Sequence, residues 1–405
     1  MPSTRTLPFV LALLTITAVR GQWTPLNSGI TSVQSMTALN GDLFAATYPS
    51  GVKKSTNGGT AWSPVNTGLP QSGANYYVRA VGTDGTHLFA GTQDGVYRSD
   101  NSGTSWSVMN GTMPYSTTNY ANKFFSFSGV TFAVFSASIA NGGGIYRTDN
   151  AGTTWNIGHS GMSSNAVVYH LTLVGGTIYA SSNVGLWTSI DQGLNWTAVS
   201  SANYAVYGLA SIGNRLVITS TFGYRYSTNN GSTWNDATGD PANPTDGEIV
   251  AFDGNLYALS GTSNACYRST DNGSTWSGYN GGFSMIDAGA QEEFFVDGTT
   301  LYCSALFDIY TITGTNVGLP EEVRGNDRVG PTLTDGDLLV HLGAAPHGNA
   351  IVLVALDGRE VLRWPGASVG DNHLDVSSVG MGAYRVLLER SGGDPPRLLG
   401  TVIVQ

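Results

Sequence analysis

A segment of nine residues recurs six times along the chain, and it limits the fold more than any other feature. The copies are KSTNGGTAW from 54, RSDNSGTSW from 98, RTDNAGTTW from 147, TSIDQGLNW from 188, YSTNNGSTW from 226 and RSTDNGSTW from 268. They end at Trp62, Trp106, Trp155, Trp196, Trp234 and Trp276, which stand 38 to 49 residues apart. Repeats of this length are typical of the blades of a β-propeller.

Each copy has the form S/T-x-D/N-x-G-x-x-W, which suits a tight hairpin between two strands. The third position is Asn57, Asn101, Asn150, Asp191, Asn229 or Asp271. Its side chain accepts hydrogen bonds from turn amides, the glycine supplies a positive φ, and the tryptophan buries its ring against the sheet. Four of the six copies carry asparagine, so we assign these positions a structural role and predict no ring of calcium-binding carboxylates.

This pattern resembles the Asp-box, or BNR, repeat of sialidases, sortilin-type receptors, xyloglucan-cleaving enzymes and a photosystem II assembly factor. The resemblance implies an all-β propeller with the boxes at the blade periphery, on the face away from the ligand. Seven short glycine turns, from Asn40-Gly41 to Asp297-Gly298, stand against six boxes. The segment QWTPLNSG from Gln22 matches AWSPVNTG, which follows the first box. We therefore predict a seven-bladed propeller over 22–314 whose last blade is closed by the N-terminal strand.

The two ends of the chain predict export. Arg5, an apolar stretch from Leu7 and the small Gly21 form the layout of a signal peptide over residues 1–21. Cys266 and Cys303 are expected on adjacent blades and form either one disulfide or two unpaired core thiols.

After a linker over 315–330, the composition changes, and short apolar runs predict a small Ig-like β-sandwich over 331–405. The segments VALDGREVLR and LDVSSVGMGAYRVLLE resemble the type A C-terminal sorting domain of the type IX secretion system. The family usually opens with a Pro-Asn-Pro segment, of which only Pro331 is present here. The resemblance implies that the secretion machinery exports the chain to the cell surface or the medium.

Composition excludes several classes of function. Charged residues make up 11% of the chain and the formal net charge is −10, without any basic run, so a nucleic-acid footprint is not expected. No later segment has the length of about 20 apolar residues that a membrane helix needs. We expect an exported monomer without a transmembrane segment, a cofactor or a metal.

The innermost strands predict the candidate site, because they line the central channel of a propeller. Counting back six residues from the turn glycines gives one level around the channel: Ser35, Arg79, Lys123, His170, Tyr207, Glu248 and Glu292. One interpretation is a polarised site for a polar ligand, held by Arg79 and Lys123. The alternative is that these residues are polar because the channel holds water. Rim tyrosines, Tyr76, Tyr77, Tyr115, Tyr120 and Tyr204, either stack on sugar rings or pack between blades.

Two functions remain from different classes. The first is a non-enzymatic propeller that binds an extracellular glycan or protein. The second is a secreted glycoside hydrolase that uses Glu248 and Glu292 or Glu293 as its acid and base. This alternative includes sialidase-like and other Asp-box glycosidases, although a sialidase is disfavoured because the ring offers one arginine where such an enzyme needs three. Arg98, Arg147 and Arg268 precede the boxes and are expected as exposed strand residues near the periphery.

Overall fold

The computed structural model describes most of the propeller region and parts of the C-terminal module. The described residues are 23–111, 113–116, 118–239, 247–260, 265–283, 291–314, 328–329, 337–342, 350–355, 360–365, 370–376, 382–389 and 397–404. The predicted signal peptide and most of the predicted linker lie outside them, so both boundaries stay predictions.

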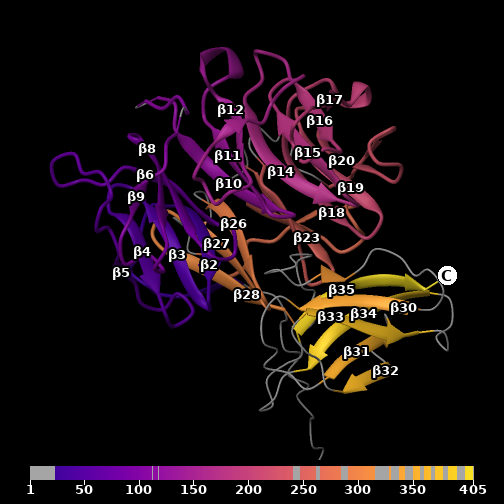
Figure 1. Cartoon of the computed structure of the whole chain (residues 1–405). Coiled ribbons are helices and arrows are strands. Elements are labelled where there is room, and N and C mark those ends of the chain that lie inside the picture. The colour runs from indigo at the N-terminus through magenta and orange to yellow at the C-terminus, as the bar shows by residue number, and fades with distance from the viewer. Residues whose placement is uncertain are drawn as a thin grey trace, which may run out of the picture.

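Seven four-stranded antiparallel sheets follow one another around the ring, as predicted (Figure 1). The first three blades contain β2 (Val33–Leu39), β3 (Asp42–Thr47), β4 (Gly51–Ser55) and β5 (Ser63–Pro64); β6 (Val78–Thr83), β7 (Leu88–Thr92), β8 (Gly95–Ser99) and β9 (Ser107–Val108); and β10 (Ala121–Phe127), β11 (Val130–Phe135), β12 (Gly144–Thr148) and β13 (Asn156–Ile157). The next two contain β14 (Val168–Val174), β15 (Thr177–Ser182), β16 (Gly185–Ser189) and β17 (Thr197–Ala198); and β18 (Val206–Ile212), β19 (Arg215–Ser220), β20 (Gly223–Ser227) and β21 (Asn235–Asp236). The last two contain β22 (Ile249–Phe252), β23 (Asn255–Ser260), β24 (Ala265–Ser269) and β25 (Ser277–Gly278); and β26 (Gln291–Asp297), β27 (Thr300–Ala305) and β28 (Ile309–Thr313) with β1 (Thr24–Pro25).

The predicted closure of the ring is confirmed. Thr24 of β1 pairs with Thr311 of β28, and Pro25 pairs with Tyr310, so the N-terminal strand is the outer strand of the seventh blade. Asp308 adds a second connection, because its carboxylate accepts hydrogen bonds from the backbone N–H groups of Asn27 and Ser28. The two ends of the propeller are therefore held together by both backbone pairing and a carboxylate.

The second strand of each blade is buried along its length, because it lies between two neighbouring sheets. All five residues of β7 are buried, and so are all six of β11. Small and apolar side chains fill these strands, in runs such as LFAGT and TFAVF. Their burial on both faces removes the alternation of polar and apolar residues that a strand with one wet face would show.

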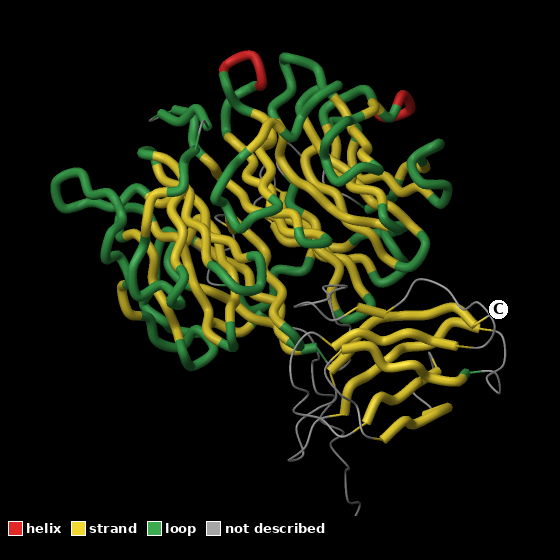
Figure 2. Tube along the Cα trace, viewed as in Figure 1, coloured by secondary structure: helices red, strands yellow, loops and turns green. Residues whose placement is uncertain are grey.

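The propeller has two ends, which we call the upper face and the box face. The upper face carries the turns between second and third strands and the connections between blades, including two short 3-10 helices, η1 (Ile139–Asn141) and η2 (Ser200–Ala202), red in Figure 2. The box face carries the Asp boxes and the turns after the innermost strands. The loops that connect the blades and the repeated boxes thus lie at opposite ends of the propeller.

The six boxes share one hydrogen-bond pattern. In the third blade, the Thr148 hydroxyl donates to Asn150 Oδ1 over 2.9 Å and accepts from the Gly152 N–H over 3.0 Å, while Asn150 Oδ1 also accepts from the Thr154 N–H. Ala151 and Gly152 both have positive φ, at 55° and 79°. The same contacts centre on Asn57, Asn101, Asp191, Asn229 and Asp271.

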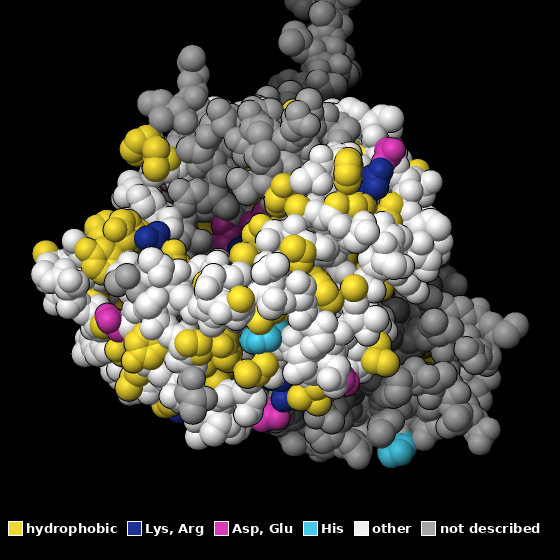
Figure 3. All heavy atoms as spheres, turned by 90° about the horizontal axis from the view of Figure 1, so that it is seen from above, with side chains coloured by type: hydrophobic (Ala, Val, Ile, Leu, Met, Phe, Trp, Pro, Cys, Tyr) yellow, Lys and Arg dark blue, Asp and Glu magenta, His cyan; other side chains and the backbone are white. Residues whose placement is uncertain are grey.

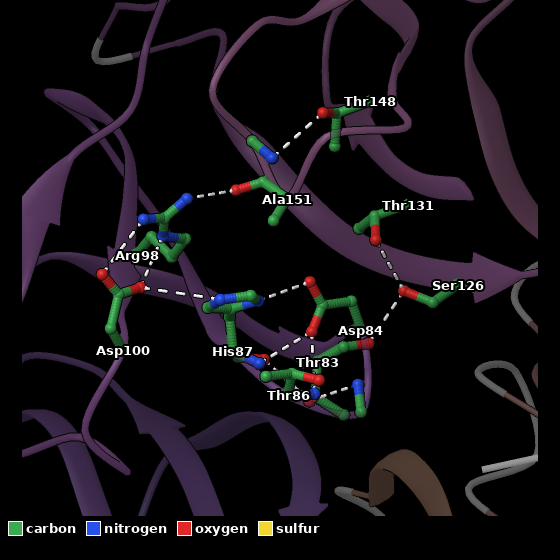
Figure 4. A network of polar contacts seen from close by, with 12 residues as sticks. Thr83, Asp84, Thr86, His87, Arg98, Asp100, Ser126, Thr131, Thr148 and Ala151 are labelled. Atoms are coloured by element: carbon green, nitrogen blue, oxygen red, sulfur yellow. Dashed lines mark hydrogen bonds and ion pairs between the residues drawn. The ribbon is translucent and has the colours of Figure 1, made fainter. Parts of the chain in front are cut away.

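Some boxes also form hydrogen bonds to the preceding blade. Trp106 of the second blade donates its indole N–H to the Val65 carbonyl over 2.7 Å, and Trp196 donates to Gly158 over 2.8 Å. Figure 4 shows the reverse contact, in which Arg98 of the second blade reaches the Ala151 carbonyl in the box of the third blade over 2.6 Å. The repeated segment therefore shapes a hairpin and joins neighbouring blades.

Arg98, Arg147 and Arg268, which precede three of the boxes, were expected to be exposed, and this prediction was wrong. Arg147 is 6% exposed, and the Arg98 side chain, 14% exposed, is paired with Asp100 at 2.6 Å. Arg268 stacks on the Tyr257 and Tyr279 rings. Their long side chains lie along the blade surfaces, where the stems cover apolar area and the guanidinium groups find acceptors.

Replacing Asp271 tests whether the box needs a carboxylate. Asp271→Asn is expected to leave the free energy of unfolding within about 0.5 kcal/mol, because an asparagine there can donate to Thr275 as Asn150 donates to Thr154. Asp271→Ala is expected to cost about 1 kcal/mol through the lost turn hydrogen bonds. Denaturant unfolding measures both, and equal losses in the two variants would show that the charge matters.

Both cysteines lie where the repeats predict, Cys266 in β24 and Cys303 in β27. Of the two predicted alternatives, the structure contains the unpaired thiols, which are fully buried in one core cluster together with Trp23 and Phe294. Burial raises the pKa of both thiols. These thiols therefore behave as core side chains rather than as reactive groups.

The described strands of the C-terminal module form two sheets. One contains β29 (Arg328–Val329), β30 (Asp337–Leu342) and β33 (Gly370–Asp375); the other contains β31 (Ala350–Ala355), β32 (Glu360–Pro365), β34 (Gly382–Glu389) and β35 (Arg397–Val404). Val340 and Leu374 from the first sheet share a buried cluster with Ile351, Leu353 and Val386 from the second. The module is all-β with its own core.

Candidate functional site

A cavity of about 220 Å³ opens into the central channel, and the innermost strands line it. Its polar lining includes Lys123 from β10, His170 from β14, Glu248 just before β22 and Glu293 from β26. Several phenylalanines also line it, among them Phe125, Phe127 and Phe295. The channel therefore combines charged groups with an aromatic wall.

A β-bulge in the innermost strands decides which residues reach this channel. In six blades the strand pairing skips one residue near the upper end, at Gln34, Arg79, Asn122, Tyr169, Tyr207 and Glu292. Ser35, Lys123, His170 and Glu293 directly follow their bulges. A bulge places two residues opposite one and redirects the side chains.

The predicted level is therefore wrong at three of its seven positions. Arg79, Tyr207 and Glu292 are bulge residues, and their neighbours Ala80, Gly208 and Glu293 occupy the level of Lys123. The reason is in the turns: Gly213 and Gly298 come first in their two-residue turns, whereas Gly41 and Gly129 come second, so counting back from the glycine slips by one. In the second blade the last paired residues are Thr83 and Leu88, so four residues separate the strands and the count slips there too. The Glu292 side chain lies outside the described part of the chain.

The two channel glutamates hold the innermost strands together. Glu248 Oε2 accepts the Phe294 N–H of the next blade over 2.7 Å, and Glu293 Oε2 accepts the Met36 N–H of the first blade over 2.9 Å. Ser35 repeats this contact by accepting the Val81 N–H over 2.8 Å. An innermost strand has no further strand beside it, so these side chains supply acceptors for backbone N–H groups that have lost theirs.

Lys123 crosses the channel to these carboxylates. Its Nζ lies 2.9 Å from Glu248 Oε1 and 4.0 Å from Glu293 Oε1. Burial by itself lowers the Lys123 pKa, but the attraction of both glutamates and the hydrogen bond to Glu248 outweigh it, so the pKa is raised. Lys123 is therefore a charged partner of Glu248, which leaves it poorly suited to act as a free cation for a ligand.

His170 faces the same cavity in its neutral form. Its ring contacts the Phe125 ring edge-on at 4.9 Å. Burial lowers the pKa of His170 to about 4, and the Lys123 charge contributes in the same direction. At neutral pH the ring is therefore uncharged, so the predicted cationic arc of Arg79, Lys123 and His170 does not form.

The lowered pKa of His170 predicts a loss of stability in mild acid. The unfolded chain binds a proton near pH 6.5 and the native chain does not until about 4, so unfolding is favoured as the pH falls through this window. Allowing for water in the channel, we expect a loss of about 2 kcal/mol between pH 7 and 4. The His170→Gln variant should lack this acid-dependent loss of stability, and urea unfolding of the wild type and the variant at several pH values measures it. Parallel pH curves for the two proteins would contradict the assignment.

Arg79 lies at the upper face instead of in the channel. Its guanidinium carbon stands 4.3 Å from the Tyr48 ring centroid and 5.4 Å from that of Tyr120, and Nη1 donates to Gln34 Oε1 over 3.1 Å. Tyr48 also contacts Tyr77 at 5.3 Å. We call Arg79, Gln34, Tyr48, Tyr77 and Tyr120 the Arg79 cradle.

A second group of similar composition stands on the fifth blade. The Tyr204 and Phe222 rings meet edge-on at 4.9 Å, and Arg225 lies 5.4 and 5.5 Å from their centroids. Phe222 is 63% exposed. Figure 3 looks onto the upper face and shows hydrophobic side chains in several groups around a hollow that contains acidic and basic atoms.

Sequence reasoning missed Gln34, Tyr48 and Phe222. Tyr48 and Phe222 both occupy the turn after the second strand of a blade, which always lies at the upper face. An aromatic residue at that turn is the signal that could have identified them. Tyr207 contacts Tyr169 at 5.9 Å on the same part of the innermost strands.

The described residues contain no group of three or more His, Cys, Asp or Glu side chains that could hold a metal ion. Within those same ranges, no helix has the length and the hydrophobicity needed to cross a membrane.

Comparisons with solved structures identify the fold. A structure of YCF48 bound to D1 peptide is 14% identical, with a TM-score of 0.54 over 73% of this chain and 97% of that one. PorZ, a surface component of the type IX secretion system of Porphyromonas gingivalis, is 15% identical with a TM-score of 0.50 over 93% of this chain and 60% of that one. AFV00434, an ancestral GH74 enzyme, is 14% identical with a TM-score of 0.53 over 93% of this chain and 63% of that one.

These likenesses show a β-propeller fold. No family model and no curated protein matches the sequence.

Proposed function

We propose that this chain is a non-enzymatic binding module that takes an extended segment of a protein ligand across the upper face of its propeller. The observation that carries the proposal is the gathering of exposed aromatic rings and two arginines on that face, in the Arg79 cradle and around Phe222. Aromatic residues and arginine are enriched in the energetically important parts of protein interfaces. A propeller of similar fold, YCF48, binds a peptide, which supports a protein ligand over a glycan.

The channel carboxylates do not favour the hydrolase alternative. Glu248 and Glu293 each accept a backbone N–H, and both face Lys123. A general acid or base must reach the glycosidic oxygen or a water beside it, whereas these carboxylate oxygens already contact backbone N–H groups and the Lys123 ammonium group. Release of reducing sugar from a polysaccharide by the wild-type protein and not by Glu248→Gln would contradict the proposal.

Peptide selection tests the binding function. The purified chain lacking residues 1–21 is presented to a library of random 12-residue peptides, and we expect enriched sequences. Phe222→Ser should weaken the binding of the selected peptides about tenfold, because a large exposed ring contributes more than 1 kcal/mol when a ligand buries it. Ile190→Ser is the matched control, since Ile190 is 86% exposed but lies in a box on the opposite face. No enrichment, or equal losses in both variants, would refute the upper face as the site.

The route to the outside is the second part of the proposal. A signal peptide over 1–21 takes the chain across the inner membrane, and an Ig-like sorting domain over 331–405 directs it to the type IX secretion system and to the cell surface or medium. In a bacterium with this system, a reporter fused to residues 315–405 and preceded by a signal peptide should appear outside the cell. Retention of that fusion in the periplasm would reject the sorting role.

A further inference from the structure

We propose that the Arg79 cradle is a carboxylate subsite that binds an acidic side chain of the protein ligand, an inference that rests on the binding function proposed above. Tyr48 and Tyr120 pack against the Arg79 guanidinium and form the aromatic part of the subsite, and Arg79 supplies the counter-charge for the ligand. The subsite lies at the upper end of β6, beside the mouth of the channel.

The first observation is that one edge of the Arg79 guanidinium is unused. Nη1 donates to Gln34, but Nε is buried and has no hydrogen-bond acceptor, and Nη2 donates to no described residue. Nε and Nη2 form the fork that holds a carboxylate through two parallel hydrogen bonds. A buried donor without an acceptor is costly, so a ligand that supplies one gains affinity at this position.

The second observation is that the charge of Arg79 is not neutralised. Among the described residues, no carboxylate oxygen lies within 4 Å of it, whereas Arg98 and Arg225 pair with Asp100 and Asp236 at 2.6 and 2.7 Å. Arg215 also stacks on a ring, that of Tyr226, but its Nη1 contacts three oxygens of the sixth box. Arg215 is therefore a stacked arginine whose Nη1 group already contacts acceptors of its own fold.

The third observation is how the fold holds Arg79 in place. The bulge between Val78 and Ala80 leaves Arg79 outside the strand pairing, and its side chain meets the rim residues Tyr48 and Tyr120. Two residues of the first blade orient the guanidinium: its plane lies over the Tyr48 ring, and its Nη1 donates to Gln34 Oε1. A guanidinium that is already oriented loses little side-chain freedom when it binds a planar anion.

A direct test observes the Arg79 Nε–H signal by NMR during titration with N-acetylglutamate amide. The signal is expected to shift and saturate, and to stay in place with N-acetylglutamine amide, which has the same shape without the charge. The shift should also disappear as the pH falls below the pKa of the ligand carboxyl, about 4.3. An unmoved signal, an equal response to the neutral amide, or a response to glucuronate alone would overturn the inference.

A second test uses peptides selected by the wild-type protein. We expect them to contain an acidic residue, and Arg79→Gln to weaken them tenfold or more, with Arg79→Lys between the two because lysine keeps the charge and loses the fork. Arg215→Gln removes the same charge from the box face and should change nothing. If peptides bind but tolerate Arg79→Gln, the binding function stands and the carboxylate subsite is rejected. If no peptide binds but the Nε–H signal responds, the subsite stands and the protein-ligand function is rejected.

Discussion

Replacing Trp23 with alanine is expected to lower the free energy of unfolding of the propeller by about 3–5 kcal/mol, the range for removing a large aromatic side chain from a core. Trp23 is 1% exposed, and its ring stacks on Phe294 at 6.0 Å and meets Phe283 at 5.0 Å. Its indole N–H donates to the Tyr279 carbonyl over 3.0 Å. The residue precedes β1 directly, so its loss removes the anchor of the strand that closes the ring.

Guanidinium unfolding followed by fluorescence measures this effect. Trp23→Phe, which keeps a ring in the same pocket, should cost less than the alanine variant. Ile190→Ala, at a side chain that is 86% exposed, should stay within about 0.5 kcal/mol of the wild type. A loss below 1 kcal/mol in Trp23→Ala would mean that the N-terminal strand contributes little to closure.

Removing the Glu248 side chain is expected to cost about 3 kcal/mol, because it breaks a largely buried ion pair from one side. The side chains of Lys123 and Glu248 are 27% and 13% exposed. Glu248→Ala leaves Lys123 with Glu293 at 4.0 Å and leaves the Phe294 N–H without its acceptor. Glu248→Gln keeps an acceptor for that N–H and should cost about 1–2 kcal/mol.

A double-mutant cycle with Lys123→Met separates the ion pair from the backbone contact. We expect a coupling energy of at least about 1 kcal/mol between Lys123 and Glu248. Since the pKa of Lys123 is raised, its contribution is complete below the ordinary lysine pKa of about 10.4 and disappears only as the pH rises through the higher native value. Additive single variants would show that the two charges do not stabilise each other.

The two structural features that these variants test differ in how far the sequence predicted them. The pairing of the N-terminal strand β1, which directly follows Trp23, with the last blade was expected from a local match, QWTPLNSG against AWSPVNTG, and the structure confirms it. The ion pair was not expected, because the sequence placed Lys123 and Glu248 on opposite arcs of one ring. Their side chains are long enough to meet across the channel.

The strand register at the candidate site shows why the residues that face the channel could not all be predicted from the sequence. Glycine is acceptable at either position of a two-residue turn, so it identifies the turn without identifying the position. A slip of one residue moves a side chain to the other face of its strand. In the second blade, four residues separate the last paired residues, Thr83 and Leu88, and the resulting slip moves Arg79 from its predicted channel position to the rim, where it meets Tyr48 and Tyr120.

The sequence by itself determined the number of blades, the hairpin at each box and the closure by the N-terminal strand. These features depend on residues within one repeat or on matches between repeats, so local physical rules are sufficient for them. The tertiary structure decided that Glu248 and Glu293 hold backbone N–H groups of the next blade and that Arg79 meets Tyr48 and Tyr120. These contacts join innermost strands and rim loops of different blades, and their geometry depends on bulges that one added residue creates.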